Sequence, residues 1–264
     1  MKTIEKLRAN EILYVEELTV NQIIQSLYDR KSVRVFEEKQ LSESDKKLII
    51  DAAIQAPTAG NQVLYTILDI DDNKIKHELS IICDNQPFIE KAPFVLVFLA
   101  DCRKWYDAYS LAGIDAREPG VGDILLACED AVIAAQNAVI AAESLGIGSC
   151  YIGDILENKE KAVRLLNLDR YTLPITMLIF GYPTEQQSNR PKPKRFNSRY
   201  IVQKNRYSPM NENQIKDMFQ EVHDEDGFDY NEYMKAFCAR KYMSEFALEM
   251  NRSVFEYFKN FMKL

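Results

Sequence analysis

Apolar and polar residues along the chain alternate between helical and extended spacing. Thr19 is placed to cap a helix that ends near Arg30. Ser42, followed by Asp45 three residues later, forms a plausible capping box for a second helix, which Pro57 ends. The residues from Pro57 onward, P-T-A-G-N-Q, predict a loop by composition.

Four extended runs rich in Ile, Val, Leu, Phe and Tyr predict strands, at 64–70, 93–101, 147–152 and 173–182. Between the second and third runs, 123–145 predicts a helix of roughly 35 Å with apolar residues on nearly every side. Such a helix is expected to be buried in the middle of the molecule.

Composition and charge narrow the functional classes. The 264 residues are 47% hydrophobic with a formal net charge of -7, so a large core is expected and a general nucleic-acid binder is not. Five scattered cysteines without a C-x-x-C pair indicate reduced, mostly buried thiols. The N-terminus carries Glu and Lys where a signal peptide has its apolar region, so a cytoplasmic protein is expected. The two histidines, His77 and His223, lie too far apart in sequence for a His-rich metal site.

A cluster of cationic and hydroxyl side chains follows the first predicted helix, at Arg30, Lys31, Ser32 and Arg34. Cations at a helix end can simply complement the helix dipole. However, Arg30, Ser32 and Arg34 alternate, so in an extended segment they would point the same way, toward one anionic ligand. A second basic stretch at 186–207 contains R-P-K-P-K-R and no acidic residue. Two such clusters in an acidic protein suggest a phosphorylated cofactor.

The glycines of G-I-G-S-C-Y-I-G, residues 146–153, do not form a dinucleotide fingerprint, because they close a helix and enter a strand. Gly146 is interpreted as a helix C-cap. Gly153 either forms a simple turn or lets a planar ligand approach the backbone closely.

Five motifs, in this order, resemble the FMN-dependent nitroreductase family over Val20 to Tyr207: R-K-S-V-R, A-P-T-A-G-N-Q, N-Q-P-F-I-E-K-A-P, G-I-G-S-C-Y-I-G-D-I and K-P-K-R. The resemblance implies an α+β fold, with a central mixed, mainly antiparallel sheet wrapped by helices, and an intertwined homodimer. It implies an N-terminal extension at 1–18, an FMN-binding domain at 19–209 and a helical C-terminal extension at 210–264 that packs on the core or on the partner.

The resemblance also assigns site residues. Arg30 and Ser32 would hold the FMN phosphate or ribityl chain, and Arg34 would lie near the pyrimidine end of the ring. Lys31 is a further cofactor-binding candidate in the same segment. The remaining cofactor-binding candidates form three groups: a loop that reaches the flavin of the partner, the backbone near flavin N5, and the C-terminal phosphate cations. In that order they are Pro57, Thr58, Ala59 and Asn61; Ile152, Gly153 and Asp154; and Lys192, Lys194 and Arg195.

The resemblance implies an FMN-dependent oxidoreductase that carries hydride from NAD(P)H to nitroaromatic, quinone or flavin acceptors by a ping-pong mechanism. No catalytic side chain and no metal are expected, because the flavin itself accepts the hydride. The alternatives are a flavin-fragmenting or dehalogenating enzyme on the same fold, and an FMN-binding store or sensor without turnover. The expected partners are a second copy of the chain and small electron acceptors, with no nucleic acid and no membrane.

Overall fold

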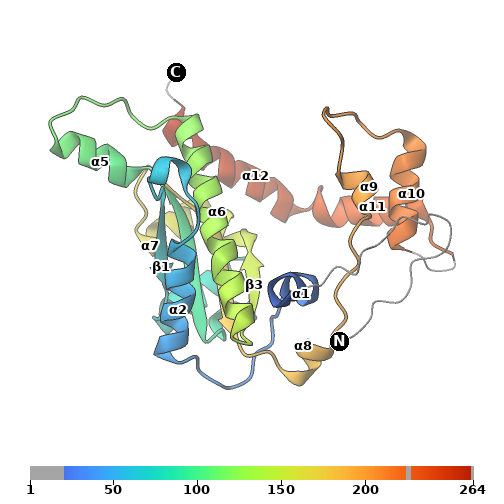
Figure 1. Ribbon diagram of the computed structural model, residues 1–264. Helices are drawn as coiled ribbons and strands as arrows, with labels where there is room; N and C mark the ends of the chain where they lie inside the picture. Colours follow the sequence, from blue (N-terminus) through green and yellow to red (C-terminus); the bar gives the residue numbers. More distant parts are fainter. Residues whose placement is uncertain (1–20, 224–226, 263–264) are drawn as a thin grey trace.

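A computed structural model of the chain describes residues 21–223 and 227–262. Its centre is a four-stranded antiparallel sheet in the order β1-β2-β4-β3 (Figure 1). The four strands confirm the four predicted extended runs, and they are β1 (Tyr65–Asp69), β2 (Phe94–Asp101), β3 (Gly148–Ile152) and β4 (Thr172–Gly181). A single parallel bridge between Ser32 and Ser149 adds the mixed character at the β3 edge. The α+β fold expected from the sequence is therefore confirmed.

Helices cover both faces of the sheet. All eight residues of β2 are buried, because alternate side chains enter apolar clusters on opposite faces. One face packs against α2 (Glu43–Ile54) and α6 (Val121–Ser144), and α1 (Gln22–Asp29) lies against α6. The other face is covered by α3 (Asn73–Ile82), α4 (Pro87–Glu90), the 3₁₀ turn η2 (Gly153–Leu156) and α7 (Lys159–Leu166).

The helix starts follow from local capping chemistry. The Ser42 hydroxyl accepts a hydrogen bond from the Asp45 amide at 3.1 Å, as the sequence predicts for the start of α2. In α1 the cap is Asn21, whose side-chain oxygen accepts from the Ile24 amide at 3.0 Å. The predicted cap Thr19 lies outside the described residues.

Helix α6 has a mixed environment, so the prediction of a helix buried on every side is wrong for the single chain. By length and composition alone it could span a membrane. Its alanine-rich face, however, packs against the sheet and α2, as in a core helix. Its opposite face leaves Leu125, Leu126, Val132 and Ile133 between 40% and 49% exposed. The sequence pattern shows that these positions are apolar, but it cannot show whether they are covered by the same chain or by another.

The C-terminal part forms a lobe that stands away from the sheet (Figure 1). An extended arm leaves α8 (Glu185–Asn189) and leads to α9 (Ser198–Ile201), α10 (Glu212–Val222) and α11 (Tyr230–Lys241). Helix α12 (Glu245–Phe258) and the turn η3 (Lys259–Phe261) then return to the body, where Tyr257 and Phe261 are buried beside Tyr171. The helices predicted after Met210 are therefore present.

Candidate functional site

The two basic segments singled out in the sequence lie against each other. The Lys31 ammonium donates to the carbonyl oxygens of Ser188 and Arg190, both at 2.5 Å. In return, Arg190 Nη2 donates to the Ser32 carbonyl at 2.7 Å. The structure thus brings together clusters that are about 160 residues apart in sequence.

Lysine 192 is used inside the chain as well. Its ammonium donates to the carbonyls of Leu27 and Tyr28, at 2.9 and 2.7 Å, near the C-terminus of α1. A cation there satisfies terminal carbonyls and complements the helix dipole. Lys194 and Arg195 follow on the exposed arm, where Arg195 donates to the nearby Pro193 carbonyl at 3.3 Å. Of the three candidate cations in this arm, Lys192 therefore has a structural role.

Arg30 has donors that no described residue satisfies. Its Nε and Nη2 atoms are buried without a hydrogen-bond partner, and its Cζ lies 5.9 Å from the centre of the Tyr151 ring. Glu143 is near enough for the charge of Arg30 to oppose the burial that raises the pKa of that carboxyl. Because buried, unpaired guanidinium donors are costly, an anion such as a phosphate fits this position.

Arg30 and Arg34 contact aromatic rings on opposite faces of the sheet. The Arg34 Cζ lies 5.9 Å from the centre of the Phe88 ring, which packs on the sheet face opposite to that of Tyr151. Burial raises the pKa of the Cys150 thiol, and Arg34, Ser32 and Arg30 all oppose that rise. Both arginines nevertheless act on the Cys150 thiol, so the expectation that they serve one anionic ligand stays a prediction.

Gly148 explains how the first basic segment reaches the sheet. A Cβ on Gly148 would lie 2.6 Å from Val33 Cγ2, a distance that real side chains do not tolerate. The missing side chain therefore lets the backbone at Val33 donate to the Ser149 carbonyl at 2.9 Å. The sequence analysis did not assign this role to Gly148, although an isolated glycine in a strand is a signal for close backbone approach. Gly146, in contrast, has φ +72° just beyond α6, as predicted for a C-cap.

The turn after β3 offers backbone rather than side chains. Ile152 is buried, while Gly153 is exposed and a Cβ built on it would meet nothing within 4 Å. Asp154 is half-buried in the same turn. An open backbone at Gly153 is compatible with the close approach of a planar ring.

Asp130 organises the loop that begins at Pro57, and the sequence analysis missed it. This carboxylate on α6 is 3% exposed and accepts hydrogen bonds from the Thr58 hydroxyl, the Ala59 amide at 2.9 Å and the Leu64 amide at 3.2 Å. Thr58 therefore faces inward, whereas Pro57 and Asn61 are exposed. A polar residue on the apolar pattern of α6 was the available signal, because buried carboxylates need partners.

The same loop holds an unusual backbone. Gly60, Asn61 and Val63 have φ values of 57°, 56° and 51°, a region that a β-branched residue such as Val63 rarely adopts. Lys104 and Trp105 of α5 (Arg103–Leu111) fix it from outside, with Trp105 Nε1 donating to the Gln62 carbonyl at 2.7 Å and Lys104 Nζ to the Val63 carbonyl at 3.2 Å. The loop is therefore held in one strained conformation by α5 and α6.

The loop and the basic segments lie at opposite ends of the sheet. Leu64 accepts a bond from the amide of Asp101, which is paired with Thr172 at the start of β4, while Gly148 pairs with Gly181 at its end. A ten-residue strand spans about 33 Å. One chain therefore does not bring its own loop to its own Arg30.

Glu157 adds a titratable group next to the turn. One carboxylate oxygen of Glu157 is buried without a hydrogen-bond partner. Burial raises its pKa to about 7, assisted by the charges of Asp84, Asp154 and Glu249 and opposed by Lys161. The group can thus hold a proton near neutral pH.

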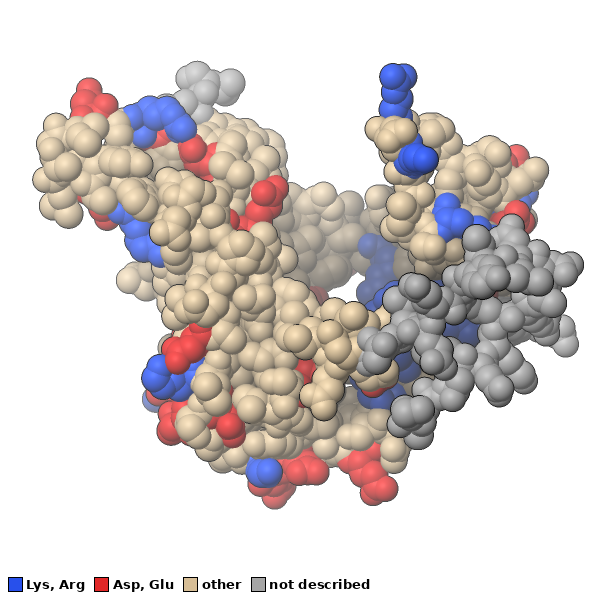
Figure 2. Space-filling view, in the orientation of Figure 1, with Lys and Arg blue, Asp and Glu red and all other residues tan. Residues whose placement is uncertain are grey.

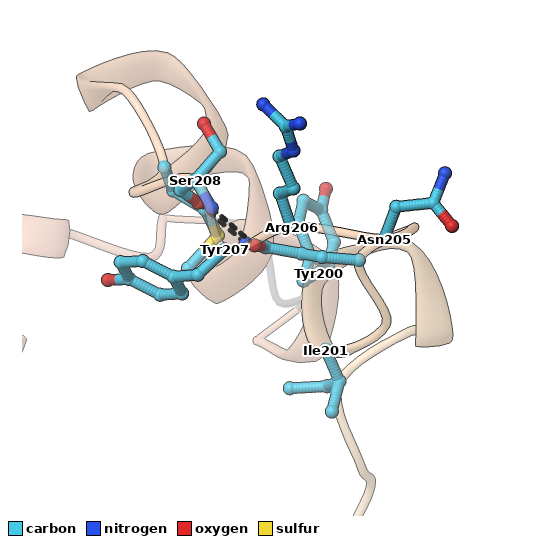
Figure 3. A pocket seen from close by; sticks show the side chains of 8 residues that line it. Tyr200, Ile201, Asn205, Arg206, Tyr207 and Ser208 are labelled. Atoms are coloured by element: carbon cyan, nitrogen blue, oxygen red, sulfur yellow. Dashed lines mark hydrogen bonds between the residues drawn. The ribbon is translucent and has the colours of Figure 1, made fainter.

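One cavity lies away from all of these residues. It has a volume of about 550 Å³ and is formed by the loop at 200–210, including Tyr200, Arg206 and Tyr207 (Figure 3). Gln203 and Ser208 close this loop through two hydrogen bonds of 2.6 Å. None of the predicted site residues lines it, so the unsatisfied donors of Arg30 locate the candidate site better than cavity size does.

Comparisons with known proteins agree with these features. The nitroreductase family model matches residues 27–182. An FMN reductase [NAD(P)H] of Bacillus subtilis is 27% identical over 179 residues, which are 66% of this chain and 70% of that relative.

Two solved structures have the same overall fold. The chain of Bacillus megaterium NfrA2 superposes with a TM-score of 0.73 at 26% identity, covering 88% of this chain and 97% of that one. For the NfrA1 nitroreductase of Bacillus subtilis the TM-score is 0.74 at 25% identity, covering 89% and 98%. Since the family model covers more than half of the sequence and the fold agrees, this chain belongs to the nitroreductase family.

Proposed function

We propose that this oxidoreductase binds FMN and transfers hydride from NAD(P)H to nitroaromatic, quinone or flavin acceptors. The observation that carries the proposal is the pair of buried, unpartnered donors of Arg30 beside a second basic segment. The relative in Bacillus subtilis named as an FMN reductase that uses NAD(P)H supports the choice of cofactor and donor.

The basic residues form two groups: those that contact FMN, and those that hold the surrounding segments in place. Arg30 and Ser32 bind the phosphate or the ribityl chain, and Lys194 or Arg195 adds a further cation from the arm. Lys31 and Lys192 hold the two basic segments and α1 together through backbone carbonyls. Their contribution is to position the residues that contact FMN.

FMN, when bound, supplies the ring that accepts and returns the hydride, so the protein needs no nucleophile. Arg34 would lie at the pyrimidine end of the ring, where a fixed guanidinium stabilises negative charge. The backbone from Ile152 to Asp154 would lie against the ring, because it is open at Gly153. These residues bind and orient, and none of them has to transfer a proton.

The site is shared between two chains in this proposal. Because Pro57, Ala59 and Asn61 lie at the other end of the sheet from Arg30, they serve the flavin of the partner. The apolar stripe on α6, together with the 62% and 45% exposed Ile23 and Leu27 of α1, supplies a surface for a second copy. Figure 2 shows a hollow between the body and the C-terminal lobe, with basic side chains beside it, and we assign the lobe to packing on the partner.

A cytoplasmic location belongs to the same proposal. Cys83, Cys102 and Cys150 are buried free thiols, and burial raises the pKa of Cys102 to about 12. Such thiols are unreactive and suit a reducing compartment.

Stopped-flow spectroscopy tests the function. The purified protein is expected to be yellow, with about one FMN per chain, and NADPH should bleach it without an acceptor. Adding menadione should restore the colour, and parallel double-reciprocal lines should follow, because donor and acceptor use one open face in turn. Intersecting lines would contradict the ping-pong mechanism, and a preparation that takes up no FMN would contradict the whole proposal.

The same panel separates the alternatives. A protein that binds FMN but is not bleached by NADPH would be a store or sensor. Consumption of the flavin, or halide release from a halogenated aromatic, would indicate the fragmenting or dehalogenating chemistry.

Co-expression tests the shared site. An Arg30→Ala chain paired with an Asn61→Ala chain should form heterodimers with one doubly altered site and one intact site. Activity above that of both homodimers is expected. Activity no better than the worse homodimer would show that each site is built from a single chain.

A further inference from the structure

Ser253 connects the C-terminal helix α12 to the turn that follows β3. It is fully buried, its hydroxyl donates to the Leu156 carbonyl at 2.6 Å, and the same oxygen accepts from the Lys159 amide at 2.9 Å. The hydroxyl therefore bridges the last residue of η2 and the first residue of α7.

The turn depends on this bridge because its own residues do not cap α7. Asn158, the residue before the helix, has a left-handed backbone with φ 53° and makes no capping bond with its side chain. That side chain instead donates to the Ile82 carbonyl at the end of α3, at 3.0 Å. Ser253 takes the capping role from 94 residues further along the chain. The segment is thus held by α3 on one side and α12 on the other.

The four residues of η2 begin with Gly153, whose backbone is the open surface described above. A short 3₁₀ turn has little freedom, and Glu157 N is also bonded to the Asp154 carbonyl at 3.0 Å. A shift of the Leu156 carbonyl is therefore expected to move the backbone of Gly153 and Asp154 as well.

We propose that Ser253 is a positioning residue for the reaction: it fixes, from the C-terminal extension, the backbone at Gly153 and Asp154 that lies against the flavin. This inference rests on the proposed function. It gives α12 a part in the chemistry beyond packing. A misplacement of about 1 Å in the groups that position the reacting atoms is enough to lower the rate of hydride transfer.

A second contact between the same two helices provides a matched control. Arg252, adjacent to Ser253, pairs with Glu160 of α7 at 3.0 and 2.8 Å and with Glu249 of its own helix at 2.7 Å, and within the described residues it does not bond to η2. Its side chain is 44% exposed, so the pair contributes little to stability. Arg252→Gln therefore removes a contact between α12 and α7 and leaves the bridge through Ser253 in place.

The experiment compares Ser253→Ala with Arg252→Gln and the wild-type holoprotein in stopped-flow reduction by NADPH. For Ser253→Ala we expect the limiting reduction rate to fall about tenfold, the dissociation constant for NADPH to stay within twofold, and the midpoint potential of the flavin to shift. Arg252→Gln should leave the reduction rate and the dissociation constant for NADPH within twofold of wild type, and the midpoint potential unchanged. Equal behaviour of the two variants would overturn the inference.

Hydrogen exchange of the peptide that covers 153–158, compared with every protein saturated with FMN, provides a second measurement. Exchange should be faster in Ser253→Ala and unchanged in Arg252→Gln, whereas unchanged exchange in both would overturn the positioning role. If the wild-type protein were not bleached by NADPH, the proposed function itself would fail. If NADPH reduced the wild-type protein normally and Ser253→Ala had the same reduction rate and hydrogen exchange as wild type, only the positioning role would be rejected.

Discussion

The contact network of Asp130 allows a quantitative prediction about the loop that begins at Pro57. Replacing Asp130 by Ala leaves the buried Leu64 amide and the partly buried Ala59 amide without acceptors. Each buried, unsatisfied donor costs about 1–3 kcal/mol, while the Thr58 hydroxyl can rotate toward another acceptor. The free energy of unfolding should therefore fall by about 2–6 kcal/mol, a large share of the 5–15 kcal/mol typical of a folded domain. Asp130→Asn retains one acceptor oxygen and should lose roughly half as much.

The only tryptophan in the chain makes the effect visible. Trp105 Nε1 donates to the Gln62 carbonyl, so the indole reports directly on the strained loop. Urea titrations at a fixed chain concentration and with excess FMN should show a lower midpoint for Asp130→Ala by circular dichroism. The fluorescence of Trp105 should shift to the red at lower urea than the circular dichroism transition, because the loop is released first.

Asp51→Ala is the matched control for the loss of a carboxylate. Asp51 lies on α2, where it forms an exposed pair with Lys47 that contributes little. Its unfolding free energy should stay within about 0.5 kcal/mol of wild type. An equally small change in Asp130→Ala, with unaltered tryptophan emission, would refute the assignment of Asp130 as the organiser of this loop.

Three further predictions concern the cofactor and pH. Arg30→Ala should weaken FMN binding about 10- to 100-fold by equilibrium dialysis, because a charge-assisted contact worth about 1.5–3 kcal/mol is lost, and unchanged affinity would remove the phosphate assignment. Arg34→Ala should slow flavin reduction by NADPH while FMN stays largely bound, and loss of FMN at an unchanged rate would give Arg34 a binding role instead. Glu157 has its pKa raised to about 7 from the ordinary 4.5, so the folded state holds a proton that the unfolded chain releases, and stability should be lost as pH rises from about 5 through 7. Glu157→Gln should flatten the thermal midpoint across that range, and parallel profiles for both proteins would contradict the raised pKa.

The sequence determined the elements and the order of the motifs. The four strands follow from runs of β-branched and aromatic residues, and the cap at Ser42 follows from one hydroxyl at the start of an apolar repeat. Both signals are local, since they depend on side chains a few residues apart. The loop at Pro57 and the basic cluster at Arg30 were likewise readable from composition.

Only the tertiary structure decided how these pieces meet. It separated Arg30 from Arg34, placed the Asn61 loop at the far end of the sheet, and left one face of α6 uncovered. It also revealed Asp130 and Ser253, whose partners lie 66 to 97 residues away in sequence. A one-dimensional pattern records that a position is polar or apolar, but burial and hydrogen bonding depend on which distant segment lies against it. For that reason the sequence alone could show that Asp130 and Ser253 are polar, and only the packing of α6 on the loop and of α12 on the turn could show what each of them holds.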